Sequence, residues 1–182
     1  MLEGLAAATI MATKWDRQSP FINPMCGSGT LAIEAVLLVT NRKPGLFRTN
    51  YSFMHFIGYD QEVYRKELEI IRQQVTEVPD LIVIASDISE DAIEIAKANA
   101  GSAGVKDLIR FKQCDFADTF IHEDRPGVIY FNPEYGERLG NSTELESTYA
   151  RIGDFMKKKC RGYTGYIFTG NLELAKKIGL KA

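Results

Sequence analysis

Short runs, of which 81–85 and 127–131 are wholly apolar and 109–114 alternates, are separated along the chain by longer stretches in which apolar residues recur every three or four positions. The short runs have the length of β-strands, and a run without polar interruption is typical of a strand buried on both faces. The predicted strands cover residues 20–23, 81–85, 109–114, 127–131 and 163–169. The predicted helices cover residues 1–15, 31–41, 61–78, 90–103, 142–159 and a short stretch after Asn171. Strands that alternate with helices predict a parallel sheet covered on both faces, a doubly wound α/β domain.

Local signals support several helix boundaries. Ser89 and Asn171 stand directly before predicted helices, where a side-chain oxygen binds free backbone N–H groups, so both are expected to be N-caps. Pro79 is expected to end the 61–78 helix. Residues 43–79 as a whole, rich in aromatic side chains, are interpreted as a segment inserted before the second strand. One face of the 142–159 helix is expected to pack on the core through Leu145, Tyr149, Ile152 and Phe155 or Met156.

Composition places the chain among ordinary globular domains. Of 182 residues, 45% are hydrophobic and 25% charged, so one compact domain is expected. The 22 basic and 24 acidic residues leave a formal charge of -2, which gives no chain-wide attraction for a polyanion. The three cysteines, Cys26, Cys114 and Cys160, are too scattered for a metal site and are typical of a reducing cytosol. No apolar run approaches the roughly 20 residues that cross a bilayer, so no membrane association is expected. Together with the scattered cysteines, this predicts a cytoplasmic protein that binds no metal.

Four predicted strands lead into a turn or a polar residue. The first runs into the glycine-containing segment 24–30, and the others stop at Asp87, Asp115 and Asn132. Because ligands of doubly wound sheets bind outside the carboxyl ends of the strands, these positions are expected to gather at one edge. The sequence therefore predicts a ligand site there.

The turn with Gly27 and Gly29 allows a ligand to approach the backbone beside the N-terminus of the next helix. A tight turn without any ligand is the alternative. A nicotinamide-binding turn would have a third glycine where Ala32 stands and an acidic residue about 20 positions later. The dinucleotide interpretation is thus disfavoured, although the 43–79 insertion would account for the distance to Asp87.

Two acidic residues offer contacts to a nucleoside. An ionised Asp87 accepts hydrogen bonds through two oxygens, as both ribose hydroxyls require, whereas its alternative role is to cap the helix that follows. Asp115 offers an acceptor for an adenine amino group, and Phe116 places an apolar ring beside it. The alternative for Asp115 is an ordinary residue between a strand and a loop.

The segment 132–140 carries the most specific chemistry. The Asn132 side-chain oxygen and the Pro133 carbonyl can both accept from an exocyclic amino group and raise the electron density on its nitrogen. Tyr135 can hold a base by stacking. The alternative is a turn that happens to be rich in Asn, Pro and Gly.

Several motifs together resemble the THUMP-associated RNA guanine-N2 methyltransferase family, which includes bacterial enzymes that act on 23S ribosomal RNA. They span nearly the whole chain and are Asn23-Pro24-Met25-Cys26-Gly27-Ser28-Gly29-Thr30, Ser86-Asp87-Ile88, Asn99-Ala100, Cys114-Asp115-Phe116 and the segment 132–140. The resemblance implies a Rossmann-like methyltransferase that uses S-adenosylmethionine. It implies cofactor contacts from Asn23, Pro24, Met25, Cys26, Gly27, Gly29, Thr30, Asp87, Ile88, Asp115, Phe116 and Asn132, and catalytic roles for Asn132, Pro133 and Tyr135.

The chain departs from this family in three ways. Asn23 stands where the family usually has Asp, and Glu134 stands where it usually has a second proline. The RNA-binding THUMP region and the last strands of the sheet are not found, so residues 1–182 are interpreted as a catalytic domain. The basic cluster Lys157-Lys158-Lys159 with Arg161 is interpreted as a solvated helix end, with phosphate contact as the alternative.

The predicted reaction is direct transfer of a methyl group to the N2 amino group of a guanine in RNA, with 23S ribosomal RNA as the expected partner. It needs neither a metal nor a covalent enzyme intermediate, because positioning and the two acceptors at Asn132 and Pro133 carry it. Two alternatives stay open. One is N6 methylation of adenine in DNA or RNA, and the other is a cofactor-binding module without catalysis.

Overall fold

Within residues 1–134 and 142–180, which the computed structural model describes, five strands form one sheet in the order β3-β2-β1-β4-β5. All neighbouring pairs are parallel, so the predicted doubly wound α/β fold is confirmed. The strands are β1 (Phe21–Pro24), β2 (Val83–Asp87), β3 (Arg110–Gln113), β4 (Val128–Phe131) and β5 (Thr164–Ile167). Each lies within two residues of its predicted position.

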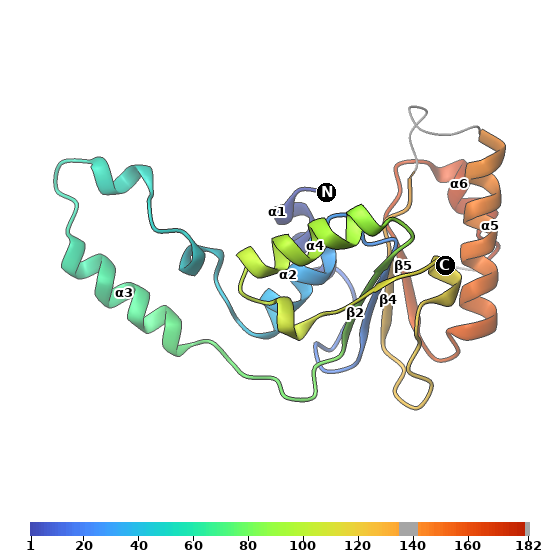
Figure 1. Ribbon diagram of the computed structural model, residues 1–182, viewed down its shortest axis with the longest axis horizontal. Helices are drawn as coiled ribbons and strands as arrows, with labels where there is room; N and C mark the ends of the chain where they lie inside the picture. The colour runs from blue at the N-terminus through green and yellow to red at the C-terminus, as the bar shows by residue number, and fades with distance from the viewer. Residues whose placement is uncertain (135–141, 181–182) are drawn as a thin grey trace.

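Helices cover both faces of the sheet, α1, α2 and α4 on one side and α5 and α6 on the other (Figure 1). The α-helices in the described part of the chain are α1 (Glu3–Met11), α2 (Thr30–Val39), α3 (Gln61–Gln73), α4 (Glu90–Ser102), α5 (Ser142–Lys159) and α6 (Leu172–Lys177). Short 3-10 helices are η1 (Pro44–Phe47), η2 (Ser52–His55), η3 (Lys106–Leu108) and η4 (Phe116–Asp118). None of the described helices is both long and apolar enough to cross a bilayer.

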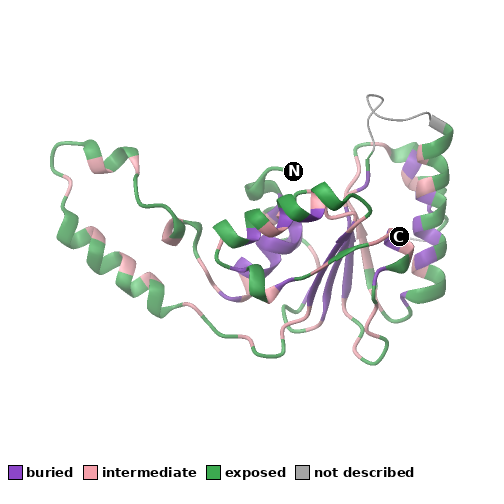
Figure 2. Ribbon diagram, viewed as in Figure 1, coloured by how far each residue is buried: buried purple, intermediate pink, exposed green. Residues whose placement is uncertain are grey.

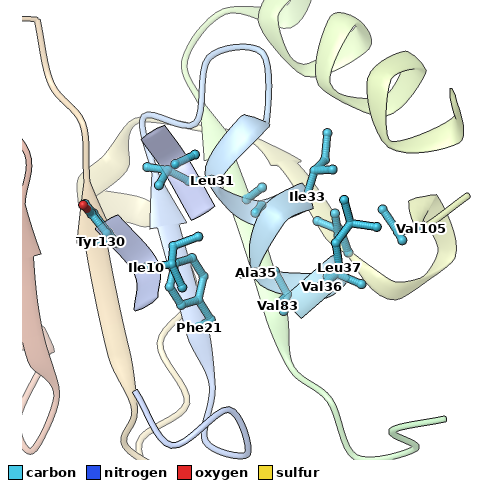
Figure 3. Packing of buried hydrophobic residues seen from close by; sticks show 14 of the residues in the cluster. Ile10, Phe21, Leu31, Ile33, Ala35, Val36, Leu37, Val83, Val105 and Tyr130 are labelled. Carbon is cyan, nitrogen blue, oxygen red and sulfur yellow. The ribbon is translucent and has the colours of Figure 1, made fainter. Parts of the chain in front are cut away.

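Alternation along the strands divides the core into two layers. Successive side chains of a strand point to opposite faces, so Phe21 and Ile22 belong to different clusters. Phe21, Val83 and Tyr130 pack with α1 and α2 (Figure 3). On the other face, Ile22, Ile84, Ile129 and Phe131 pack against Ile152 and Phe155 of α5, as the apolar face of that helix predicted. Strands β1, β2 and β4 together with α2 are accordingly the most continuously buried parts of the molecule (Figure 2).

Both predicted N-caps are confirmed, but two predicted helix ends are wrong. Helix α1 ends at Met11, not at residue 15. The Ser89 side chain accepts from the Ala92 N–H, and the Asn171 side chain accepts from the N–H groups of the first turn of α6. Helix α3 ends at Gln73, not at residue 78. The Thr76 N–H instead donates to the Thr40 carbonyl at 2.9 Å, and residues 74–76 therefore return to the end of α2.

The inserted segment extends away from the body as an arm that carries α3 (Figure 1). Its aromatic side chains gather around Phe53, whose ring centroid lies 5.3 Å from Tyr51, 6.0 Å from Tyr59 and 5.7 Å from Tyr64. No residue of α3 is fully buried. The arm thus has a small aromatic cluster of its own and leaves the carboxyl edge of the sheet uncovered.

Gly127 fixes the approach of β4 to β1, and we expect Gly127→Ala to lower the free energy of unfolding by about 3 kcal/mol. A Cβ at this position would overlap the Pro20 carbonyl, which accepts the Val128 N–H at 2.8 Å, so backbone on both sides must move. Chemical denaturation would measure the loss. Gly101→Ala is the matched control, because nothing lies within 4 Å of its Cβ and alanine favours a helix. A loss below about 1 kcal/mol at Gly127 would contradict this account.

Candidate functional site

A cavity of about 370 Å³ lies at the carboxyl edge of the sheet, where the strand-end residues were expected to meet. Nine residues predicted for the site line it: Met25, Cys26, Gly27, Thr30, Asp87, Ile88, Asp115, Phe116 and Asn132. Six lining residues were not predicted: Met1, Ser28, Leu31, Glu134, Thr148 and Arg151. The turn after β1 and the ends of β2, β3 and β4 therefore converge on one cavity.

The turn after β1 is held in a conformation that favours glycine. Gly27 and Gly29 have φ values of 54° and 81°, and Met25 also has a positive φ of 56°. A Cβ on Gly29 would lie 2.9 Å from the Ala96 Cβ of α4, so this glycine allows close packing and does not line the cavity. The turn therefore presents backbone to the cavity at Gly27 and packs on α4 at Gly29.

Asp87 ties the end of β2 to this turn. One carboxylate oxygen accepts from the Gly27 N–H at 2.9 Å, and the other accepts from the Ser89 N–H at 3.0 Å. A carboxylate has about four acceptor positions, so two bonds leave capacity for a ligand. The alternative role, a cap on the following helix, is wrong, because Ser89 is the N-cap of α4 and, toward that helix, Asp87 accepts only from the Ser89 N–H. The Asp87 carboxylate lines the cavity.

Asp115 and Phe116 meet a residue from α5 that the sequence analysis did not select. The Arg151 guanidinium lies 2.8 and 2.9 Å from the two Asp115 oxygens and 4.8 Å from the centroid of the Phe116 ring. Burial acts to raise the pKa of Asp115, but hydrogen bonds from Arg151 and from the Ala117 N–H outweigh it and hold the pKa below its usual value. Asp115 is thus an ionised acceptor at neutral pH, and an arginine covers the apolar ring beside it.

Asn132 presents an unpaired acceptor in the loop after β4. Its side-chain oxygen is buried and has no hydrogen-bond partner among the described residues. An unsatisfied buried acceptor costs about 1–3 kcal/mol, so this oxygen is suited to an incoming donor. Glu134 also lines the cavity, with an exposed side chain. Tyr135, predicted as the stacking residue, lies outside the described residues.

Three further predicted residues are not part of the cavity lining. Asn23 is fully buried in β1, and its amide nitrogen donates to the Tyr130 carbonyl at 2.8 Å. Pro24 ends the same strand, and Pro133 is buried behind Asn132. None of these side chains lines the cavity, because the sheet and the core hold them.

Cys26 lines the cavity but is a poor nucleophile. Burial raises the pKa of its thiol to about 12, and the nearby Asp87 carboxylate acts in the same direction. A thiol with this pKa is protonated at neutral pH, and the thiolate is the nucleophilic form. Covalent catalysis by Cys26 is therefore disfavoured.

Comparison with known proteins places this geometry in a family. Residues 1–182 match the family described as RMKL-like, methyltransferase domain. The ribosomal RNA large subunit methyltransferase K/L of Syntrophotalea carbinolica is 38% identical over 99% of this chain and 26% of that protein. The solved structure of SMU.472, a putative methyltransferase complexed with SAH, has a TM-score of 0.91 at 30% identity and covers 99% of this chain and 47% of that one.

A second solved structure matches equally well. It is a predicted N6-adenine-specific DNA methylase from Listeria monocytogenes, with a TM-score of 0.91 and 35% identity over 100% of this chain and 47% of that one. The chain thus spans about a quarter of the curated relative and about half of the two solved chains. The predicted Rossmann-like fold and the prediction of S-adenosylmethionine as cofactor are confirmed at the level of the family. The chain belongs to the RMKL-like methyltransferase domain family.

Proposed function

We propose that this chain catalyses transfer of a methyl group from S-adenosylmethionine to the N2 amino group of a guanine in RNA, with 23S ribosomal RNA as the substrate. The observation that carries the proposal is the buried Asn132 oxygen, which has no partner among the described residues, in a cavity that the glycine turn and two strand-end carboxylates also line. The name of the relative from Syntrophotalea carbinolica supports ribosomal RNA as the substrate class. The sequence motifs support guanine N2 as the methyl acceptor. A ribosomal RNA substrate is consistent with the expected cytoplasmic location.

The residues along the cavity fit the parts of the cofactor. The turn from Met25 to Thr30 would hold the methionine part, where the free N–H groups at the start of α2 are available. Asp87 would accept from the ribose hydroxyls with the capacity that its two backbone bonds leave. Asp115 would accept from the adenine amino group, with Phe116 and the exposed Ile88 as apolar walls. When bound, the cofactor supplies an electrophilic methyl group on a sulfonium.

The chain's own residues would orient and activate the amino group. The Asn132 oxygen accepts one N–H bond, and the Pro133 carbonyl is expected to accept the other. Together they turn the nitrogen lone pair toward the methyl group and offset the positive charge that develops on nitrogen. A carbon–nitrogen bond forms as the carbon–sulfur bond breaks, and the surplus proton leaves the nitrogen for water. No residue has to act as a general base.

Adenine N6 is the second candidate acceptor. An amide oxygen followed by a backbone carbonyl accepts equally from an adenine amino group, and the Listeria monocytogenes structure has an N6-adenine-specific name. The base must in either case be unpaired or flipped out of its helix to reach the cavity.

Analysis of the methylated product separates these functions. The chain would be incubated with unmodified 23S ribosomal RNA and isotope-labelled S-adenosylmethionine, and the RNA would be digested to nucleosides and analysed by mass spectrometry. N2-methylguanosine is the expected product. N6-methyladenosine would replace the proposal with the second candidate, and cofactor binding without any methylated product would favour the non-catalytic module.

A further inference from the structure

A second cavity, of about 450 Å³, lies beside the first between α2, α4, η1 and the start of α1. Met1, Ser28 and Thr30 line both cavities, so the back of the glycine turn forms part of the second one. Apart from this turn, the residues used in the proposed methyl transfer, namely Asp87, Ile88, Asp115, Phe116, Asn132 and Pro133, do not line it. Its chemistry therefore has to be explained separately.

The main feature of the second cavity is a carboxylate that opens into it from an otherwise buried residue. Glu34 of α2 lines it and is only 7% exposed. Its side chain has no hydrogen-bond or ion-pair partner in the described parts of the chain. Burial raises the pKa of Glu34, and the Glu3 carboxylate across the cavity acts in the same direction. The Glu34 oxygens are not among the buried side-chain atoms that lack a partner, so the carboxylate opens onto the cavity, where an incoming cation can reach it.

The other walls define what that partner would be. Glu3 adds a second carboxylate, while the described residues that line the cavity include no lysine or arginine. Arg42, at the end of α2, is directed elsewhere and donates to the Gly104 carbonyl at 2.6 Å. Ile33, Leu37 and the partly exposed ring of Phe47 supply apolar surface. The cavity thus combines negative charge with an apolar and aromatic wall.

We propose that the second cavity is a binding site for a guanidinium group, with the Glu34 carboxylate as its ion-pair partner and Phe47 as its stacking surface. A guanidinium is planar, binds a carboxylate through two parallel N–H bonds and stacks on aromatic rings, whereas an ammonium is more strongly hydrated. Its aliphatic stem would pack on Ile33 and Leu37. The guanidinium comes either from an arginine side chain on a polypeptide or from a small guanidino compound.

Binding of N-acetyl-argininamide tests the proposal directly. Titration of the chain, followed by NMR chemical shifts, should show saturable binding in the range of about 1 mM, with shifts around Ser28, Phe47 and Asn99. An affinity of this size is sufficient for an arginine on a tethered segment, because effective concentrations reach the millimolar range. N-acetyl-citrullinamide, the uncharged isostere, should bind at least about tenfold more weakly.

Matched variants decide the role of Glu34. Glu34→Gln keeps the shape, removes the charge and should weaken argininamide binding at least about tenfold. Glu67→Gln, at an exposed position of α3, should leave it unchanged. Because Glu34→Gln also removes an unpaired charge, it should fold and should not melt below the parent chain. Competition by free guanidinium chloride at low millimolar concentration distinguishes the two sources of the guanidinium group. If guanidinium competes as strongly as argininamide, a small guanidino compound is favoured. If it competes more weakly, the aliphatic stem contributes to binding and an arginine side chain is favoured.

Three results would overturn the proposal. They are no saturable binding of argininamide by the folded parent, equal binding by citrullinamide, and unchanged binding by Glu34→Gln. The proposal does not rest on methyl transfer, so it stands or falls separately from the proposed function.

Discussion

Replacing Asn132 with alanine is expected to lower the rate of methyl transfer by about 100- to 1,000-fold, the effect of removing one preorganised polar group from a transition state. The side-chain oxygen is buried and unpaired, so its first donor would be the amino group of the target base. Cofactor affinity should change by no more than about twofold, because this oxygen accepts from the substrate. The measurements are kcat with saturating RNA and S-adenosylhomocysteine binding by calorimetry.

Stability and a conservative variant provide the controls. Asn132→Ala removes an unsatisfied buried oxygen, so its free energy of unfolding should be no lower than that of the parent chain. Asn132→Asp keeps an acceptor at the same position and should retain more activity than the alanine variant. A folded Asn132→Ala protein with full activity would show that the loop after β4 does not hold the amino group.

The second large effect is expected at Asp87, where alanine should weaken binding of S-adenosylmethionine and S-adenosylhomocysteine by about 100-fold or more. The change removes a ribose acceptor worth about 1.5–3 kcal/mol as a charged hydrogen bond. It also frees the Gly27 N–H, which Asp87 holds at 2.9 Å, and so loosens the turn that receives the methionine part. Calorimetry on the folded variant would measure the loss.

Asp80→Ala is the matched control, because this aspartate is exposed in the coil before β2 and lies outside the cavity. Asp87→Asn separates the two roles. An amide supplies one acceptor oxygen, so it can satisfy the Gly27 or the Ser89 N–H but not both, and an intermediate loss is expected. If Asp87→Ala bound S-adenosylhomocysteine within about threefold of the parent, the ribose role would be wrong. A folded parent that did not bind it would favour the non-catalytic module.

The main features of the fold and the place of the site could be predicted because their signals are local. Apolar runs such as 127–131 mark strands, and Ser89 caps its helix through bonds to residues three positions away. Alternation between strands and helices predicts a parallel sheet, and such a sheet brings the ends of its strands to one edge. Asp87, Asp115 and Asn132 therefore reach one cavity, as their positions at strand ends implied.

Other features depend on contacts between distant segments. Arg151 reaches Asp115 across 36 positions, because α5 packs against the face of the sheet where η4 begins. The Asn23 amide nitrogen donates to the Tyr130 carbonyl across 107 positions, and Asn23 does not line the cavity. Helix α3 ends early because the chain returns to Thr40. Neither the hydrophobic periodicity of a segment nor the residues adjacent in sequence predict such contacts.

The sequence by itself thus determined the order of the elements, their caps, the edge of the sheet that forms the site and the chemistry of the strand-end residues. Only the tertiary structure decided which polar groups have partners. It paired Asp115 with Arg151. Within the described residues, it left the Asn132 oxygen without a partner in one cavity and opened the unpaired Glu34 carboxylate onto another. The physical reason is that propensity and periodicity act over a few residues, whereas the pairing of a buried polar group depends on all the segments packed around it.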